Sequence, residues 1–148
     1  MLFRSAFVLQ TATTAPGIIS LNGSGTGTAA MNQYDASGNY QGINSGSNPA
    51  SPGWYLTLYV TGEGAISSAV TGSVISAINV LPLVGPPSVL IDSLPATVTY
   101  YAEAYGFVSG LLQVNVQIPQ GVRTGQADTI SLTIGGNTSQ SAVTVSVQ

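Results

Sequence analysis

The sequence contains no lysine, no histidine and no cysteine, and its only basic residues are Arg4 and Arg123. A phosphate-binding loop of the GxxxxGK type needs a lysine, and the usual serine or cysteine triads need a histidine as base. Zinc sites built from cysteine and histidine are excluded as well. Because nucleic-acid binding normally needs a basic patch, we expect no nucleic-acid partner. These absences predict a protein that is not an enzyme and that holds no cofactor and no metal.

Charge is scarce throughout the chain. Charged residues make up 5% of the 148 residues, against roughly 25% in an average soluble domain. The net charge is −3, and 44% of the residues are hydrophobic, which suits one packed domain rather than a disordered chain. No run of about 18 apolar residues occurs, so we expect no membrane span. Serine, threonine, asparagine, glutamine and glycine must therefore supply the water-facing surface.

The start of the chain differs from the rest. MLFRS, residues 1–5, resembles the translation of a sequencing adaptor, and no apolar segment of a signal peptide follows it. We expect residues 1–14 to comprise an adaptor-like scar and the tail of a preceding domain or linker, and residues 15–148 to form the domain. The alternative is that residues 1–5 are native.

Strict alternation of apolar and polar residues is the clearest structural signal. In residues 54–61 the even positions are apolar and the odd positions are tyrosine or threonine; in residues 112–118 the even positions are aliphatic and the odd positions are amides. Such alternation predicts half-buried strands, and glycine and proline separate them at short intervals. We predict an all-β, antiparallel, immunoglobulin-like β-sandwich. The predicted core contains Leu56, Leu58, Val98, Leu112, Val114, Val116, Leu132, Ile134, Val143 and Val145.

Two segments have a second possible interpretation. Residues 29–42 predict a hairpin whose turn is Asp35 to Asn39, since these are turn-forming residues. A calcium loop is the alternative, but such loops gather several carboxylates and this one has a single aspartate. The glycine-rich run GSGTGTAA lacks the strand–loop–helix context and the later acidic residue of a nucleotide-binding loop.

Four segments together resemble one known family: APGIISLNGSGTGTAAMNQ, NPASPGWYLTLYVTGEG, the long run from LPATVTYYAE to LTIGG, and SQSAVTVSVQ. They are similar to the conserved C-terminal region of large, uncharacterised secreted bacterial proteins. The most specific part is LQVNVQIP followed by a glycine turn and LTIGG. The resemblance covers nearly all of residues 15–148 and implies an immunoglobulin-like module that is extracellular or on the cell surface. Trp54-Tyr55 departs from the family pattern, which has small or aliphatic residues there.

Three functions remain open. The pattern favours a structural or interaction module that contacts neighbouring domains of a larger protein. The alternative is a carbohydrate-binding module, in which Tyr55 and Tyr59 form a contact surface for a polysaccharide. That alternative requires accessible rings flanked by amides such as Gln113 or Asn115. An enzyme would need a carboxylate pair, for example Glu63 with Glu103; their sequence context predicts instead a turn residue and a loop residue.

Overall fold

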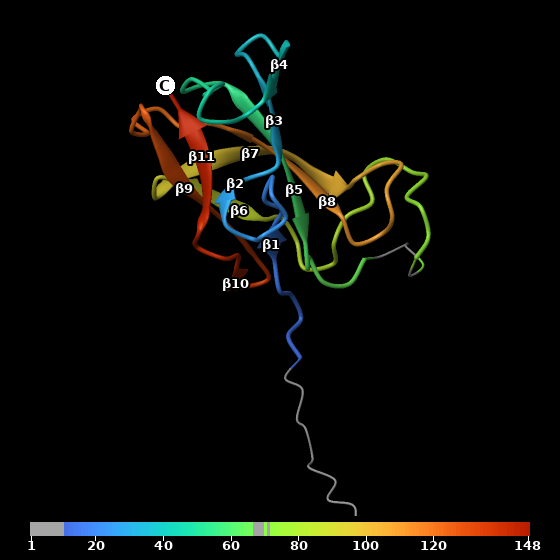
Figure 1. Ribbon diagram of the computed structural model, residues 1–148. Coiled ribbons are helices and arrows are strands. Elements are labelled where there is room, and N and C mark those ends of the chain that lie inside the picture. Colours follow the sequence, from blue (N-terminus) through green and yellow to red (C-terminus); the bar gives the residue numbers. More distant parts are fainter. Residues whose placement is uncertain (1–10, 67–69, 71) are drawn as a thin grey trace, which may run out of the picture.

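The computed structural model describes residues 11–66, 70 and 72–148, and within them every regular element is a β-strand (Figure 1). The prediction of an all-β protein is confirmed. None of the described residues forms a helix long and apolar enough to cross a membrane. The strands are β1 (Gly17–Ile18), β2 (Gly27–Thr28), β3 (Met31–Tyr34), β4 (Tyr40–Ile43), β5 (Tyr55–Thr61), β6 (Ser88–Ile91), β7 (Leu94–Glu103), β8 (Leu112–Gln117), β9 (Gln126–Ile134), β10 (Asn137–Thr138) and β11 (Val143–Val147).

One curled sheet contains these strands, in the order β2-β11-β9-β6-β7-β8-β5-β3-β4, with β1 paired to β5 and β10 paired to β9. The long strand β7 joins its two halves. Residues 94–96 of β7 pair with β6, and residues 97–103 pair with β8. The first half is therefore β4-β3-β5-β8 with the end of β7, and the second half is β6-β9-β11-β2 (Figure 1).

The pairing departs from the predicted antiparallel arrangement beside β11, which has a parallel partner in β2 and a parallel bridge between Val147 and Ala50. Strand β2 runs parallel to β11, with Gly27 beside Val143 and Thr28 beside Thr144. The two residues of β2 follow a glycine-rich loop, and a strand this short carries no alternation that the sequence could reveal. All other strand pairs are antiparallel.

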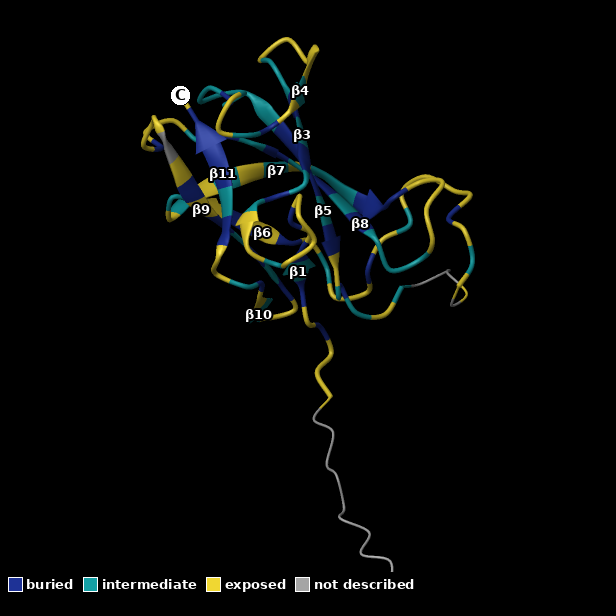
Figure 2. Cartoon of the chain, in the orientation of Figure 1, coloured by how far each residue is buried: buried dark blue, intermediate teal, exposed yellow. Residues whose placement is uncertain are grey.

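A single aliphatic core lies between the two halves. Most of its members come from the inward positions of β5 and β8 in the first half and of β6, β9 and β11 in the second, and Ile18 of β1 and Met31 of β3 join them. Buried residues predominate on β5 and β11, whereas β6 and β9 alternate between buried and more exposed residues and the loops are mostly exposed (Figure 2). Nine of the ten predicted core residues are buried; the tenth, Val98, is partly buried and packs against the core.

A buried amide also connects the halves. Asn44, after β4, donates from Nδ2 to the Ser146 carbonyl oxygen of β11 (2.8 Å), and its Oδ1 accepts from the Ser146 backbone N–H (2.9 Å). Asn44 Nδ2 also donates to Gln33 Oε1 at 2.8 Å. Because buried polar groups must be paired, these contacts fix how the two halves meet.

The segment before β1 packs on the sheet at Thr14. Residues 1–10, part of the predicted scar and linker, lie outside the described residues. Thr14 Oγ1 donates to the Ile134 carbonyl oxygen (2.8 Å), and Asn137 Nδ2 donates to Thr14 Oγ1 (2.9 Å). The proposed boundary between residues 14 and 15 remains a prediction, but Thr14 itself contacts the domain.

Candidate functional site

The outward face of the first half is lined by tyrosine, threonine and amides. Strands β5 and β8 pair so that Tyr55 lies opposite Gln117, Thr57 opposite Asn115 and Tyr59 opposite Gln113. Side chains of directly opposed residues on one sheet face are neighbours. The alternation in residues 54–61 and 112–118 therefore correctly predicted that the tyrosines and the amides face outward. The register of β5 and β8 places the amides next to the tyrosine rings.

These side chains form an open groove of about 280 Å³. Tyr55 and Tyr59, the predicted contact surface, both line it, and both are half-buried rather than fully exposed. Thr57 lies between them and is only 6% exposed. Tyr34, on β3 opposite Tyr55, is the third ring of the groove. Tyr34 was not among the predicted contact residues, although its place in the predicted hairpin was a signal for it.

Three further tyrosines, Tyr40, Tyr101 and Tyr105, do not line the groove. Tyr40 supports the groove from outside, since its ring centroid is 5.5 Å from that of Tyr34. Tyr101 packs against the core, and Tyr105 is in an exposed loop. At the opposite end of the groove, the Phe107 ring centroid is 6.3 Å from that of Tyr59.

Polar contacts hold the groove side chains in place. Gln113 Nε2 donates to Asn115 Oδ1 at 3.1 Å, and Gln117 Nε2 donates to the Gly53 carbonyl oxygen at 3.0 Å. Burial, with a contribution from Tyr34, raises the pKa of Tyr59 above its ordinary value. The Tyr59 hydroxyl is therefore protonated at neutral pH and can both donate and accept a hydrogen bond.

The turn between β3 and β4 is confirmed as a hairpin turn. Asp35 Oδ1 accepts from the backbone N–H groups of Ser37 and Asn39, each at 2.9 Å, and Gln41 Nε2 donates to Asp35 Oδ2 at 3.0 Å. The Asn39 side-chain bond is the main cause that lowers the pKa of Asp35. Both carboxylate oxygens thus serve the turn, which favours the turn interpretation over a calcium loop.

Glu63 and Glu103 meet, contrary to their interpretation as a separate turn residue and loop residue. Strands β5 and β7 both flank β8, where Val60 and Glu103 each pair with Leu112. Each glutamate is only 1% exposed, and Glu103 contributes to the raised pKa of Glu63, so the two buried carboxyl groups are neighbours.

The geometry of this pair does not suit glycoside hydrolysis. Burial is the main cause that raises the pKa of Glu63 to about 7, and the neighbouring Glu103 carboxyl group adds to it. Glu103 Oε2 accepts from the Gly110 N–H at 2.8 Å, so the pair also fixes the loop after β7. Glycosidase carboxyl groups lie on either side of the scissile bond, roughly 5 Å or more apart. Because both glutamates are only 1% exposed, a scissile bond cannot reach a position between their carboxyl groups.

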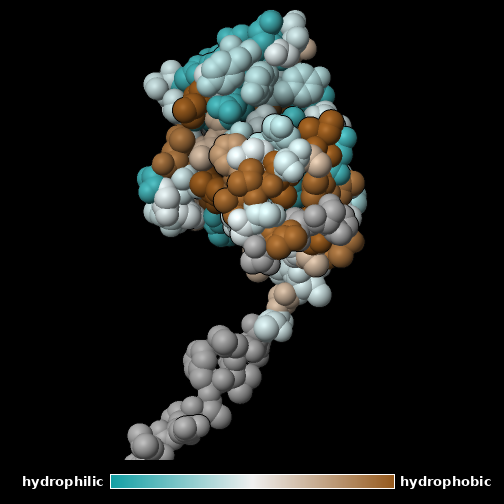
Figure 3. Space-filling view, turned by 90° about the vertical axis from the view of Figure 1, so that its right-hand side faces the viewer, coloured by the Kyte–Doolittle hydropathy of each residue, from teal (hydrophilic) through white to brown (hydrophobic). Residues whose placement is uncertain are grey.

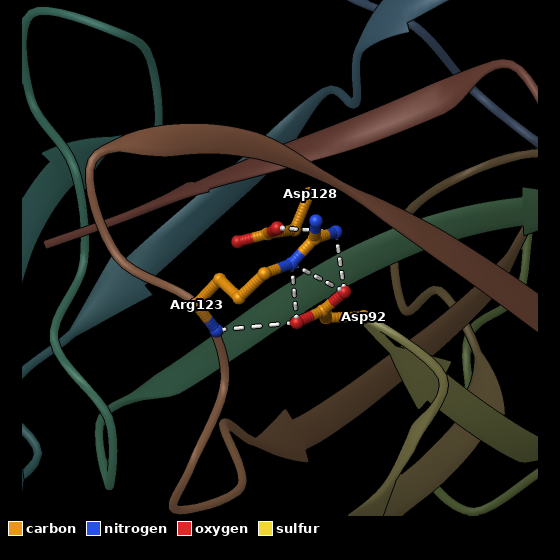
Figure 4. A network of polar contacts seen from close by, with 3 residues as sticks. All are labelled: Asp92, Arg123 and Asp128. Atoms are coloured by element: carbon orange, nitrogen blue, oxygen red, sulfur yellow. Dashed lines mark hydrogen bonds and ion pairs between the residues drawn. The ribbon is translucent and has the colours of Figure 1, made fainter.

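A second acidic cluster lies on the other half and contains the only cation of the described residues (Figure 4). Arg123 Nη2 is 2.6 Å from Asp92 Oδ1 and 3.3 Å from Asp128 Oδ1. The Arg123 side-chain bond is the main cause that lowers the pKa of Asp92, whereas burial raises the pKa of Asp128. Asp92 and Ser93 both have positive φ and form the two-residue turn between β6 and β7. Arg123 therefore links the turn between β6 and β7, through Asp92, to β9, through Asp128.

An apolar surface lies next to the end of the groove. The segment 73–84 contacts the loop after β7: Ile75 N–H donates to the Phe107 carbonyl oxygen (2.8 Å), and Val74 forms a bridge with Val108. Hydrophobic atoms gather in the middle of the face shown in Figure 3, below a hydrophilic area. We call this the apolar loop surface; its exposed members are Val74, Ile78, Leu81, Leu83, Phe107 and Val108.

No family model, no curated protein and no solved structure matches the chain.

Proposed function

We propose that the chain is a non-catalytic structural and interaction module of a larger secreted or cell-surface bacterial protein, with an immunoglobulin-like β-sandwich fold. The apolar loop surface is the observation that carries this proposal. Its six side chains are between 39% and 71% exposed, and large exposed apolar patches mark surfaces that another molecule covers.

The partner that we propose for this surface is a neighbouring domain of the same polypeptide. No member of the apolar loop surface is charged, so the surface provides no electrostatic steering toward a partner that diffuses freely. A tethered domain needs no steering, because the linker itself supplies a high effective concentration. The resemblance to a C-terminal region of larger secreted proteins supports the same arrangement.

The acidic groups support a non-catalytic role. Glu63 and Glu103 are buried against each other, and Asp35 and Asp92 are held by a turn and by Arg123. Asp35, Asp92 and Glu103 therefore each have a structural contact, Glu103 through the Gly110 N–H, and Glu63 is closed off from solvent. The remaining acid, Asp128, is buried beside Arg123.

The test compares this chain alone with the longer protein that the upstream DNA encodes. We expect a continuous reading frame with a signal peptide and at least one further domain. Hydrogen exchange of segments 73–84 and 105–109 should be slower in the longer protein than in this chain, and Ile78→Ser/Leu83→Ser should abolish the difference. A stop codon directly upstream, or identical exchange in both proteins, contradicts the proposal.

A further inference from the structure

We propose that the groove on the outward face of β3, β5 and β8 binds a neutral saccharide chain. This inference rests on the proposed non-catalytic function and names a ligand for a second surface of the same module. The groove is separate from the apolar loop surface, since none of the six residues of that surface lines it. Four properties of the groove support the proposal: its rings, its hydrogen-bonding groups, its lack of charge and its position.

The rings suit the apolar faces of sugar rings. Tyr34 and Tyr55 are directly opposed on neighbouring strands, and Tyr59 follows on the same face of β5. At a rise of about 3.4 Å per residue, Tyr55 and Tyr59 are roughly 14 Å apart along the strand. A chain of several sugar units, rather than one, is needed to contact the rings at both ends. Tyrosine provides an apolar ring face together with a polar hydroxyl, as a sugar does.

The hydrogen-bonding groups between the rings match hydroxyl groups. The Gln113 side chain donates one N–H to Asn115 Oδ1. The side-chain oxygen of Gln113 (Oε1) and the side-chain NH₂ group of Asn115 (Nδ2) have no hydrogen bond to a described residue. One accepts and the other donates, so the two amides together can hold a sugar hydroxyl, which does both. The bond between them also fixes their orientation before a ligand arrives, which reduces the entropy lost on binding.

The lack of charge selects the class of saccharide. The residues that line the groove are tyrosines, threonines, amides and one glycine, with no carboxylate and no cation. A phosphate or a uronic acid would find no positive partner there, and a nucleic acid would find none for its backbone. A neutral polysaccharide carries no charge and so requires no positive side chain in the groove.

A protein ligand is the competing occupant, and the groove suits it less well. Protein-binding surfaces have an apolar centre with a polar rim, and on this chain the apolar loop surface meets that description. In the groove, by contrast, the centre between Tyr55 and Tyr59 contains Thr57 opposite Asn115. Hydroxyl and amide groups at the centre favour a ligand that carries hydroxyls along its whole length.

The experiment is calorimetric titration of the chain with neutral hexasaccharides of glucose, xylose, mannose and N-acetylglucosamine, and with oligogalacturonate as a charged comparison. We expect saturable binding of at least one neutral chain and none of oligogalacturonate. Tyr55→Thr/Tyr59→Thr should weaken that binding at least about tenfold, because two aromatic contacts are removed. Tyr105→Thr is the matched control: Tyr105 is 62% exposed, lies outside the groove, and its replacement should leave binding unchanged.

Three results overturn the inference: no binding of any neutral chain at millimolar concentration, binding that survives in the double variant, or binding that Tyr105→Thr removes equally. A circular dichroism melt of each variant ensures that it is folded. Chromatography of the titrated saccharide separates this inference from the proposed function. Shortened products would contradict the non-catalytic role while leaving the binding groove in place.

Discussion

The outward faces of the two halves of the sheet differ in chemistry although both cover the same core. The first half presents tyrosines and amides on β3, β5 and β8. The second half presents serine, threonine, one alanine and one leucine at its outward positions, and none of these residues is aromatic; they are Ser88 and Leu90 on β6, Ala127, Thr129, Ser131 and Thr133 on β9, and Thr144 and Ser146 on β11. Hydroxyl side chains thus suffice to cover a sheet of this protein, so covering the sheet does not by itself require the rings on the first half.

The two halves also differ in how they accommodate buried acids. In the first half burial raises the pKa of Glu63, which lies beside Glu103, and no cation of the described residues forms an ion pair with either glutamate. In the second half the only cation of the described residues, Arg123, lies between Asp92 and Asp128. The first arrangement depends on a proton and the second on a charge pair, so pH should affect the two halves in opposite directions.

The largest expected effect tests whether the halves form one folding unit. Leu58→Ala on β5 and Leu132→Ala on β9 each remove a fully buried side chain from the shared core, and each should lower the free energy of unfolding by about 2–5 kcal/mol. Urea denaturation should show one transition for both variants. The outward-facing Leu90→Ala serves as control, with an expected change within about 0.5 kcal/mol. Two separate transitions would show that the halves unfold independently.

The glutamate pair should make the protein less stable as pH rises. The pKa of Glu63 is about 7 in the folded protein against an ordinary value of 4.5, so the folded state retains a proton that the unfolded state releases. The stabilisation is complete below pH 4.5 and is lost as pH rises through about 7, with a total on the order of 3 kcal/mol.

Glu63→Gln checks this explanation, because glutamine stays uncharged and can still donate to Glu103. Urea denaturation at a series of pH values should show that the variant matches the parent at pH 4.5 and exceeds it at pH 8. A variant whose stability falls with pH as steeply as that of the parent would show that another group is responsible.

Truncation should locate the start of the first half. Deleting residues 1–12 should change the free energy of unfolding by no more than about 0.5 kcal/mol. Deleting residues 1–14 also removes the hydrogen bonds of Thr14 with Ile134 and Asn137, at an expected cost of about 1–2 kcal/mol. Thermal melting of the two truncated chains measures the difference. An equally large loss in both would place an integral segment before residue 13.

On the second half, Asp92→Asn should act on the acidic side of the pH profile. The pKa of Asp92 is lowered from its ordinary 3.8 by Arg123, so its contribution is present above that pH and is lost as pH falls through the folded value. Asparagine tolerates the positive φ of this turn. We expect a slightly lower melting temperature at pH 7 and a smaller loss of stability on acidification. If Asp92→Asn and the parent lose the same stability on acidification, the role of the ion pair is contradicted.

The smallest expected effect on stability is at the groove. Cross-strand contacts of Tyr55 and Tyr59 contribute roughly 0.2–1 kcal/mol each, so Tyr55→Thr/Tyr59→Thr should lower the melting temperature only slightly. Matching changes on the second half, such as Thr133→Ala, should have a similarly small effect. A loss of several kcal/mol would mean that the rings serve mainly to hold the sheet together.

The sequence was sufficient to predict the parity of the strands but not their neighbours. Alternation in residues 54–61 and 112–118 assigned Tyr55, Tyr59 and the amides to an outward face correctly, because a strand has a fixed period of two. It could not show that β8 lies between β5 and β7. That arrangement brings Glu63 to Glu103 and places Gln113 beside Tyr59. Strand order depends on the packing of the whole sheet, and no local pattern encodes it.

The central claim is that one outward face of the sheet is a binding surface and the other is not. Backbone amide shifts, followed by nuclear magnetic resonance during titration with the neutral hexasaccharide that binds most tightly, test it most directly. We predict saturable shifts that concentrate on β3, β5 and β8 around Tyr34, Thr57 and Asn115, with β6 and β9 unchanged. Shifts that fall on β6 and β9, or on the apolar loop surface alone, would contradict it.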